Sequence, residues 1–199
     1  MKSSRFHPEA IVFGISIALL ATTVTIAAAQ ATAVTEANQA AAVIQEEKRL
    51  EALAALAEVK KVSRLEELAA TREQLDPLEL KELLSLVGFE GKALKEAWAI
   101  VMKESTGRPK SHNGNSNTGD NSYGLFQINM IGSLGEDRRE KFDLKQNSDL
   151  WNPVLNAQIA YHMSNGGEDW GSWGIGPNAY NGGKAGSYYK WLDQYPEGK

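Results

Sequence analysis

The sequence predicts a mostly α-helical protein, and three observations support this fold class. Residues 36–74 contain no glycine or proline and are rich in Ala, Glu, Lys, Leu and Arg, a composition typical of helices. Asp76 and Pro77, followed by Glu79, match the start of a further helix. Apolar and polar residues almost never alternate with a period of two, which disfavours a large β-sheet.

Length and composition limit the architecture and the classes of function. The 199 residues suit one domain with accessory segments, and 42% apolar residues are enough for a packed core. The net charge of −4 provides no overall basic field, so nucleic acid is not an expected partner. The absence of cysteine excludes disulfides, thiolate nucleophiles and cysteine-based zinc sites. No cofactor is expected.

The N-terminal residues 1–35 have the features of a membrane anchor or a signal segment. Lys2 and Arg5 precede an uncharged apolar stretch, residues 11–29, which approaches the ~20 residues that a helix needs to cross a bilayer. A retained anchor is favoured because the stretch exceeds the ~7–15 apolar residues of a signal-peptide core. The basic flank would then stay cytoplasmic, with the rest of the chain outside. A cleaved signal peptide is the alternative, with Ala27–Ala29 as its cleavage site.

Residues 36–76 are predicted to form a charged, alanine-rich helical stalk. Apolar residues recur in it at every third position: Leu50, Leu53, Leu56, Val59, Val62, Leu65 and Leu68. Three-residue spacing drifts around a helix by about 60° per step, so this is not a clean heptad seam. Ser63 and Glu66 match a capping box, which predicts a break in the helix near Lys61. The stalk is expected either to join a homo- or hetero-oligomer or to lie on the domain that follows.

Residues 77–199 are predicted to form the main domain from several short helices. The expected elements are a helix over 77–87 that stops at Gly88, a helix over 92–105, a loop over 111–121, a helix from Asn152-Pro153 and a closing helix over 187–195. Between the last two helices lies a glycine-rich segment that also carries tryptophan and tyrosine, a composition common in loops that line a groove.

One acidic residue, Glu104, is predicted to lie on the apolar face of the helix over 92–105. The residues that share this face, at spacings of three, four and seven, are Val101, Ile100 and Ala97. Lys95 and Lys103 are expected on other faces. An apolar surrounding favours the protonated form of a carboxyl group, which can then protonate the leaving oxygen of a glycosidic bond. The simpler alternative is an ordinary surface glutamate at a helix end.

Polar and aromatic residues suited to a sugar ligand follow the loop. Gln127 stands in the apolar run 124–128, where its amide needs hydrogen-bond partners such as the hydroxyl or N-acetyl group of a sugar. Backbone groups of the protein are the alternative partners. Tyr180 and Asn181 precede two glycines, and tryptophan rings can stack on sugar faces. Trp98, inside a predicted helix, is assigned to the core.

Four motifs, in order and at compatible spacing, resemble the lysozyme-like lytic transglycosylases, which cut peptidoglycan. They are Glu104-Ser105, GLFQI at 124–128, NAQIAYHM from Asn156, and AYNGG at 179–183. The resemblance extends over about residues 78–189. It implies a lysozyme-like α-helical domain, peptidoglycan glycan strands as the substrate, and Glu104 as catalytic acid and base. The substrate-binding residues that it implies are Ser105, Ser122, Tyr123, Gly124, Gln127, Tyr161, Trp173, Tyr180 and Asn181.

The position before Tyr123 separates two mechanisms. The same stretch also resembles animal-type lysozymes, which carry an aspartate there, whereas this chain has Ser122, as is usual in transglycosylases. The resemblance therefore favours transglycosylation, in which Glu104 is the only carboxylate and the product has a 1,6-anhydro end. Asp120, two residues earlier, is a candidate second carboxylate, and it makes ordinary hydrolysis the alternative if it reaches the cleft.

Further expectations concern metal, location and a competing class of protein. Residues 113–124 match a calcium loop only in part, because the twelfth position is Gly124 rather than an acid, so no metal is expected. The DNSYGLFQIN segment and the tryptophan-rich ending look most like phage virion versions of the family. The domain is therefore expected on the cell-wall side of a membrane, or in a virion component delivered into the host envelope. The competing class is a non-enzymatic protein that assembles through its helices and binds glycan.

Overall fold

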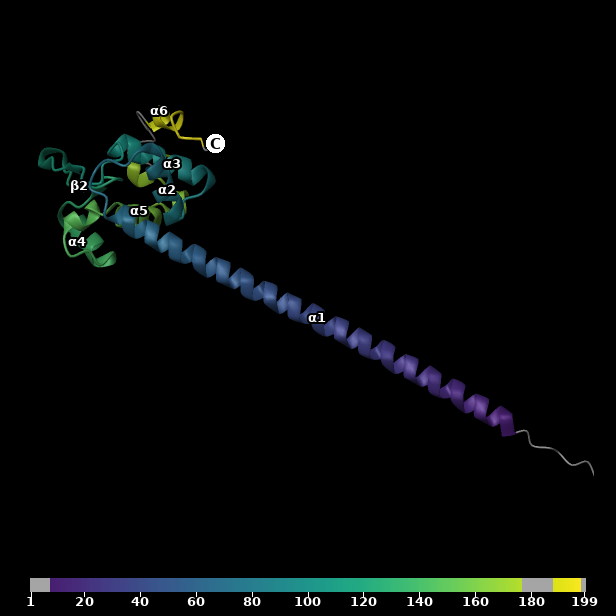
Figure 1. Cartoon of the computed structure of the whole chain (residues 1–199). Helices are drawn as coiled ribbons and strands as arrows, with labels where there is room; N and C mark the ends of the chain where they lie inside the picture. The colour runs from purple at the N-terminus through teal and green to yellow at the C-terminus, as the bar shows by residue number, and fades with distance from the viewer. Residues whose placement is uncertain (1–7, 177–187, 198–199) are drawn as a thin grey trace, which may run out of the picture. The chain divides into compact units, whose positions relative to one another are not determined.

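The chain consists of helices and one small β-sheet, and it divides into two units, residues 1–58 and 59–199. The structure, a computed structural model, describes residues 8–176 and 188–197, without the side chains of residues 8–22, 27, 28 and 116. In its described part the first unit contains helix α1 alone, and the second contains the end of α1 and the other elements (Figure 1). The predicted mostly α-helical fold class is confirmed.

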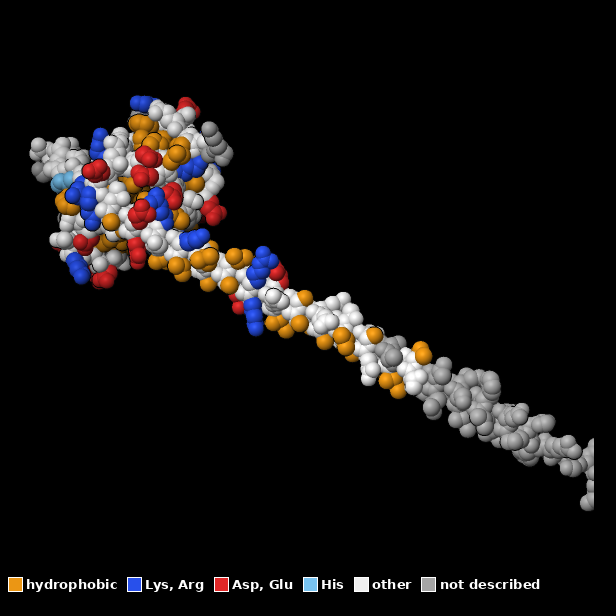
Figure 2. Space-filling view, in the orientation of Figure 1, with side chains coloured by type: hydrophobic (Ala, Val, Ile, Leu, Met, Phe, Trp, Pro, Cys, Tyr) orange, Lys and Arg blue, Asp and Glu red, His pale blue; other side chains and the backbone are white. Residues whose placement is uncertain are grey.

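Helix α1 extends from Pro8 to Ala69. The predicted break near Lys61 is therefore wrong. A capping box starts a helix only where the preceding residues are not helical, and the residues before Ser63 are good helix formers. The apolar repeat has two environments: its leucines within residues 50–56 are at least half exposed, whereas Leu68 is buried in the core of the second unit. Figure 2 shows the exposed apolar side chains of α1 between charged ones.

Helices α2, Pro77–Val87, and α3, Gly91–Glu104, lie within one residue of their predicted bounds. The Asp76 side chain accepts hydrogen bonds from two backbone N–H groups of α2, and Glu79 completes the capping box. Gly88 ends α2 with a φ of 125°, a value that a residue with a Cβ rarely adopts. The apolar faces of both helices are buried in one core, which fixes the direction in which α3 presents its last residue.

A three-stranded antiparallel sheet follows α3, in the order β1-β2-β3. Its strands are two residues each: β1 His112–Asn113, β2 Ser122–Tyr123 and β3 Ile128–Asn129. Asn113 and Asn129 are both partners of Ser122 in the ladder. The predicted loop over 111–121 therefore contains a strand, together with the single turn η1, Ser116–Thr118. Strands of two residues are too short to show a period of two, so the sequence pattern could not reveal them.

Short helices complete the second unit. They are α4 Gly132–Lys141, η2 Asn147–Trp151, α5 Pro153–Met163, η3 Asn165–Gly167, η4 Gly171–Trp173 and α6 Tyr188–Leu192. Helix α5 begins where predicted, and the Asn152 side chain caps its first N–H groups. Helix α4 is not predicted, because Gly135 is its only buried residue and it therefore lacks an apolar stripe.

The core of the second unit combines aliphatic residues of α2 and α3 with aromatic residues from later segments. The ring of Phe89 packs against those of Tyr161 and Trp170, with centroids 5.0 and 5.7 Å away. Trp98 is 1% exposed and donates its indole N–H to the Pro77 carbonyl at 3.0 Å. Its assignment to the core is confirmed.

Membrane attachment through residues 11–29 stays a prediction. Across the residues whose side chains are described, no helix is long and apolar enough to cross a membrane. Most of residues 11–29 falls outside that part of the chain.

Candidate active site

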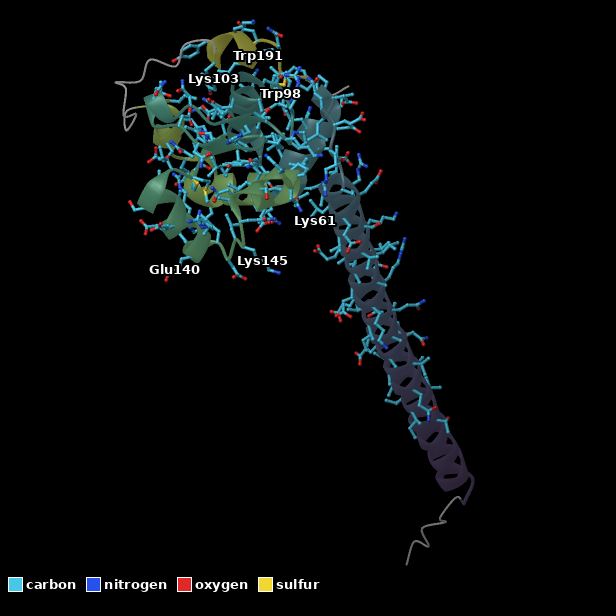
Figure 3. The ribbon with its side chains drawn as sticks, turned by 90° about the vertical axis from the view of Figure 1, so that its left-hand side faces the viewer. Lys61, Trp98, Lys103, Glu140, Lys145 and Trp191 are labelled. Carbon is cyan, nitrogen blue, oxygen red and sulfur yellow. The ribbon has the colours of Figure 1, made fainter. Side chains whose placement is uncertain are left out.

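Glu104 is the last residue of α3, and its carboxylate lies beside Lys103. The Lys103 Nζ is 2.5 Å from Glu104 Oε1, and the two side chains are 25% and 22% exposed. Ala97, Ile100 and Val101 are fully buried, as their shared face predicts. The expectation that Lys103 points away from Glu104 is wrong, because the long lysine side chain spans the 100° between neighbouring helix positions. Figure 3 marks the position of Lys103.

The chain turns sharply after Glu104. Ser105 is 5% exposed and donates both its backbone N–H and its hydroxyl to the Val101 carbonyl, at 2.9 and 3.2 Å. Gly107 has a φ of 77°, and a Cβ there would lie 2.9 Å from the Leu75 carbonyl oxygen. The Leu75 N–H also donates to the Gly107 carbonyl at 2.9 Å. These contacts fix the end of α3, where the hydroxyl of Ser105 is bonded to the helix, and its predicted role in substrate binding stays a prediction.

A second carboxylate, that of Asp120, lies next to Ser122 at the sheet. It accepts hydrogen bonds from Ser122 Oγ and from Asn113 Nδ2, the latter at 2.6 Å. Ser122 is 5% exposed, so its hydroxyl is committed to Asp120 rather than free for a ligand. Asn129 supports the same loop by donating its amide N–H to the Gly119 carbonyl at 3.2 Å. The structure therefore joins Asp120 to Ser122, although no interaction among the described residues links either of them to Glu104.

The Gln127 amide uses its nitrogen, but not its oxygen, in hydrogen bonds with the described residues. Its Nε2 donates to the carbonyl oxygens of Gly124 and Ser111, at 2.9 and 3.2 Å. The backbone thus satisfies the donor, as the alternative interpretation expects. No hydrogen bond to Oε1 occurs among the described residues, and the side chain is partly exposed. An amide oxygen in this state suits the hydroxyl or N–H group of a sugar.

Asn156 is 0% exposed and fixes the turn between β2 and β3. Its Nδ2 donates to the carbonyls of Tyr123 and Leu150, at 3.0 and 3.1 Å, and its Oδ1 accepts from the Phe126 N–H at 2.9 Å. Gly124 lies directly against this amide, because a Cβ there would be 2.2 Å from Nδ2. The glycine of the GLFQI motif is therefore required by packing, and its predicted contact with sugar stays untested.

Two aromatic residues of the predicted site lie mainly in the core. Trp173 is 7% exposed and donates its indole N–H to the Phe126 carbonyl at 2.8 Å. Its ring packs edge-on against Phe126 and Trp170, which leaves little surface for a stacked sugar. Tyr161 packs edge-on against Phe89. Trp173 thus belongs to the core and the partly buried Tyr161 packs against it, and their predicted contacts with sugar stay untested.

Of the remaining residues of the predicted site, the structure describes Tyr123 but not Tyr180 or Asn181. The partly buried ring of Tyr123 lies 4.4 Å from that of His112 and 6.1 Å from that of Trp151, measured between centroids. Tyr180 and Asn181 lie outside the described residues. In the part of the chain that is described, no group of three His, Cys, Asp or Glu residues is placed to hold a metal ion.

Sequence reasoning misses three residues that organise this region: Lys103, Asn113 and Asn156. The signal available for Asn156 is its place at the start of the NAQIAYHM motif, ahead of a helix that packs on the core. Asn113 and Lys103 carry no such signal, because their partners are set by the hairpin register and by the end of α3.

Comparison with known proteins gives a single kind of match. Residues 81–175 match the family model described as a lysozyme like domain. This range contains α3 with Glu104, the sheet and α5, and therefore every motif of the predicted site except AYNGG at 179–183. No curated protein and no solved structure matches the chain.

Proposed function

We propose that this chain is a peptidoglycan glycosidase of the lysozyme-like superfamily, and that it cleaves the β-1,4 bond between N-acetylmuramic acid and N-acetylglucosamine as a lytic transglycosylase. The observation that carries the proposal is the lysozyme-like domain over residues 81–175, with Glu104 at the end of a helix inside it. Glu104 is the proposed acid and base, and the amide oxygen of Gln127 is a proposed sugar contact. No metal or cofactor takes part in this scheme.

In the first step Glu104 protonates the leaving glycosidic oxygen as the bond from that oxygen to C1 breaks. The ion pair between Lys103 Nζ and Glu104 Oε1, 2.5 Å apart, has to open so that Glu104 can reach the glycosidic oxygen. The acetamido group of the muramyl sugar stabilises the cation at C1. The Glu104 carboxylate then removes the proton of the 6-hydroxyl, whose oxygen bonds to C1. The product is a 1,6-anhydro sugar, and no water is consumed.

Hydrolysis is the second candidate mechanism, and the position of Asp120 favours it. The carboxylate of Asp120 is held by Asn113 and by Ser122, the residue that stands where animal-type lysozymes carry their aspartate. Used as a second carboxylate, Asp120 would stabilise the sugar cation or direct a water molecule, giving a reducing end in place of the anhydro end. Mass spectrometry of the released fragments separates the two mechanisms.

Zymography on purified peptidoglycan tests the role of Glu104. Wild type is expected to clear the gel, and Glu104→Gln to lose activity by ~10²-fold or more, because the amide cannot exchange a proton. Glu90→Gln is the matched control, since Glu90 is an exposed glutamate just before the same helix and makes no capping hydrogen bond. Equal clearing by Glu104→Gln would refute the catalytic role. Binding of glycan without clearing by wild type would favour the non-enzymatic class.

The proposal extends to how the domain reaches the wall. Residues 11–29 would attach the chain to a membrane, with the catalytic domain on the cell-wall side, or would serve a virion component entering the host envelope. The half-exposed leucines of residues 50–56 suit association with other helices. N-terminal sequencing of the mature protein distinguishes a retained anchor from a cleaved signal peptide. Light scattering of the purified chain measures whether it forms oligomers.

A further inference from the structure

A cavity of about 540 Å³ lies in the second unit, where the end of α1, the segment after α3 and the start of α5 meet. Its lining residues are Arg72, Lys110, Gln146, Ser148, Asp149, Trp151, Asn152 and Leu155. Neither Glu104 nor any other predicted site residue is among them. Figure 3 shows Lys103, the neighbour of Glu104, and Lys145, the neighbour of Gln146, on opposite sides of the domain. The cavity therefore shares no lining residue with the candidate active site, and its Trp151 ring packs against the ring of Tyr123, with centroids 6.1 Å apart.

The hydrogen-bond acceptors in this wall are already used by the protein. The Asp149 carboxylate accepts the backbone N–H groups of Lys145 and Gln146, at 2.8 and 3.1 Å. The amide oxygen of Asn152 accepts those of Val154 and Leu155, at 3.0 and 3.1 Å. These bonds cap η2 and α5, so the two acceptors contribute little to a ligand.

The hydrogen-bond donors in the same wall have few acceptors among the described residues. Across the described residues, no carboxylate lies within ion-pair distance of Lys110 or Arg72, and both side chains are exposed. Within the described part of the chain, Arg72 donates hydrogen bonds from Nη1 alone, to the carbonyls of Ala69 and Thr71, at 2.8 and 3.1 Å. The amide N–H groups of Asn152 likewise make no hydrogen bond within the described part. A ligand rich in acceptors and negatively charged fits this surplus of donors.

Two further features favour an anion with a small apolar neighbour. Among the described residues, the buried indole N–H of Trp151 in this wall has no hydrogen-bond acceptor. The start of α5 adds the positive end of a helix dipole. Leu155 and the ring of Trp151 supply apolar wall beside the cations. A carboxylate carried on a short aliphatic group meets both requirements.

We infer that this cavity binds the C-terminal carboxylate of a peptidoglycan stem peptide while the glycan strand occupies the candidate active site. The choice of a stem peptide rests on the proposed function, since a peptidoglycan substrate carries such carboxylates on its peptides. Lys110 and Arg72 hold the carboxylate, and Leu155 contacts the methyl group of a terminal alanine. The cavity would then favour wall that still carries its peptides.

Isothermal titration of the full chain with the synthetic peptide L-Ala-γ-D-Glu-L-Lys-D-Ala-D-Ala tests the inference. We expect Lys110→Met to weaken binding by about tenfold and Arg72→Met/Lys110→Met to remove it, because charge-assisted contacts are lost. Lys145→Met is the matched control, since Lys145 is exposed and adjacent in sequence to the cavity but does not line it. The C-terminal amide of the peptide should bind about tenfold more weakly than the acid, because it lacks the charge.

Three results would overturn the inference: no binding of the acid, equal binding of acid and amide, or equal weakening by Lys145→Met. Glycerol phosphate serves as a second probe, and binding of this phosphate without binding of the peptide would also reject a stem peptide as the ligand. The titration does not depend on catalysis. Absence of clearing by wild type would therefore refute the proposed activity, whereas the peptide titration could still be interpreted.

Discussion

Replacing Asn156 tests whether one buried amide holds the segment that follows β2. Asn156→Ala leaves the Phe126 N–H without its acceptor, and the Tyr123 and Leu150 carbonyls without a donor, in a site that is 0% exposed. Each unpaired buried group costs about 1–3 kcal/mol, so the loss of three partners should lower the free energy of unfolding by roughly 3–9 kcal/mol. This is a large share of the ~5–15 kcal/mol typical of a domain.

Urea unfolding followed by tryptophan fluorescence measures this loss, with Asn117→Ala as the control. Asn117 is exposed and its side chain makes no hydrogen bond in the described part of the chain, so its replacement should change the unfolding free energy by less than about 0.5 kcal/mol. Asn156→Asp adds a second comparison, because it keeps the acceptor for Phe126 but turns a charged oxygen towards two carbonyls. An Asn156→Ala protein within about 1 kcal/mol of wild type would refute the reasoning.

Two further predictions concern stability. Gly124→Ala should lower the unfolding free energy by more than about 2 kcal/mol, because the new Cβ would lie 2.2 Å from Asn156 Nδ2 and 2.3 Å from the Leu150 carbonyl oxygen; an unchanged thermal midpoint would contradict this. Burial, and secondly the charge of Glu96, raise the pKa of the Tyr188 hydroxyl. The unfolded chain therefore loses the Tyr188 proton at a lower pH than the folded chain does. The protonated hydroxyl contributes fully to stability below about pH 10, and this contribution is lost as the pH rises further. Tyr188→Phe should therefore reduce the fall in unfolding free energy between about pH 9 and 11, measured with urea, and an unchanged pH dependence would count against it.

Local sequence signals were enough for the helices with clear ends. Asp76, Pro77 and Glu79 specify the start of α2 through groups only three residues apart, and Asn152-Pro153 do the same for α5. The break expected near Lys61 failed because the same short-range signal was read without the helix-forming residues before it. Helix α4 was missed because its exposed surface leaves no apolar period to detect.

The candidate site was only partly predictable, and the reason is the range of its contacts. The face shared by Ala97, Ile100 and Val101 follows from helix geometry, so their burial was predictable from spacing. The ion pair of Glu104 with Lys103 depends on where the helix ends and what surrounds that end. It was therefore predicted wrongly, although its two residues are adjacent in the sequence.

The sequence by itself determined the mostly helical class, the ends of α2, the start of α5, and the lysozyme-like character that the family match over residues 81–175 supports. These depend on backbone preferences and capping groups within a few residues of each other. Tertiary structure alone decided that Asp120 joins Ser122, that Asn156 fixes Gly124, and that Trp173 is buried. Such contacts join segments that only the packed core brings together, and no local pattern encodes a distance across that core.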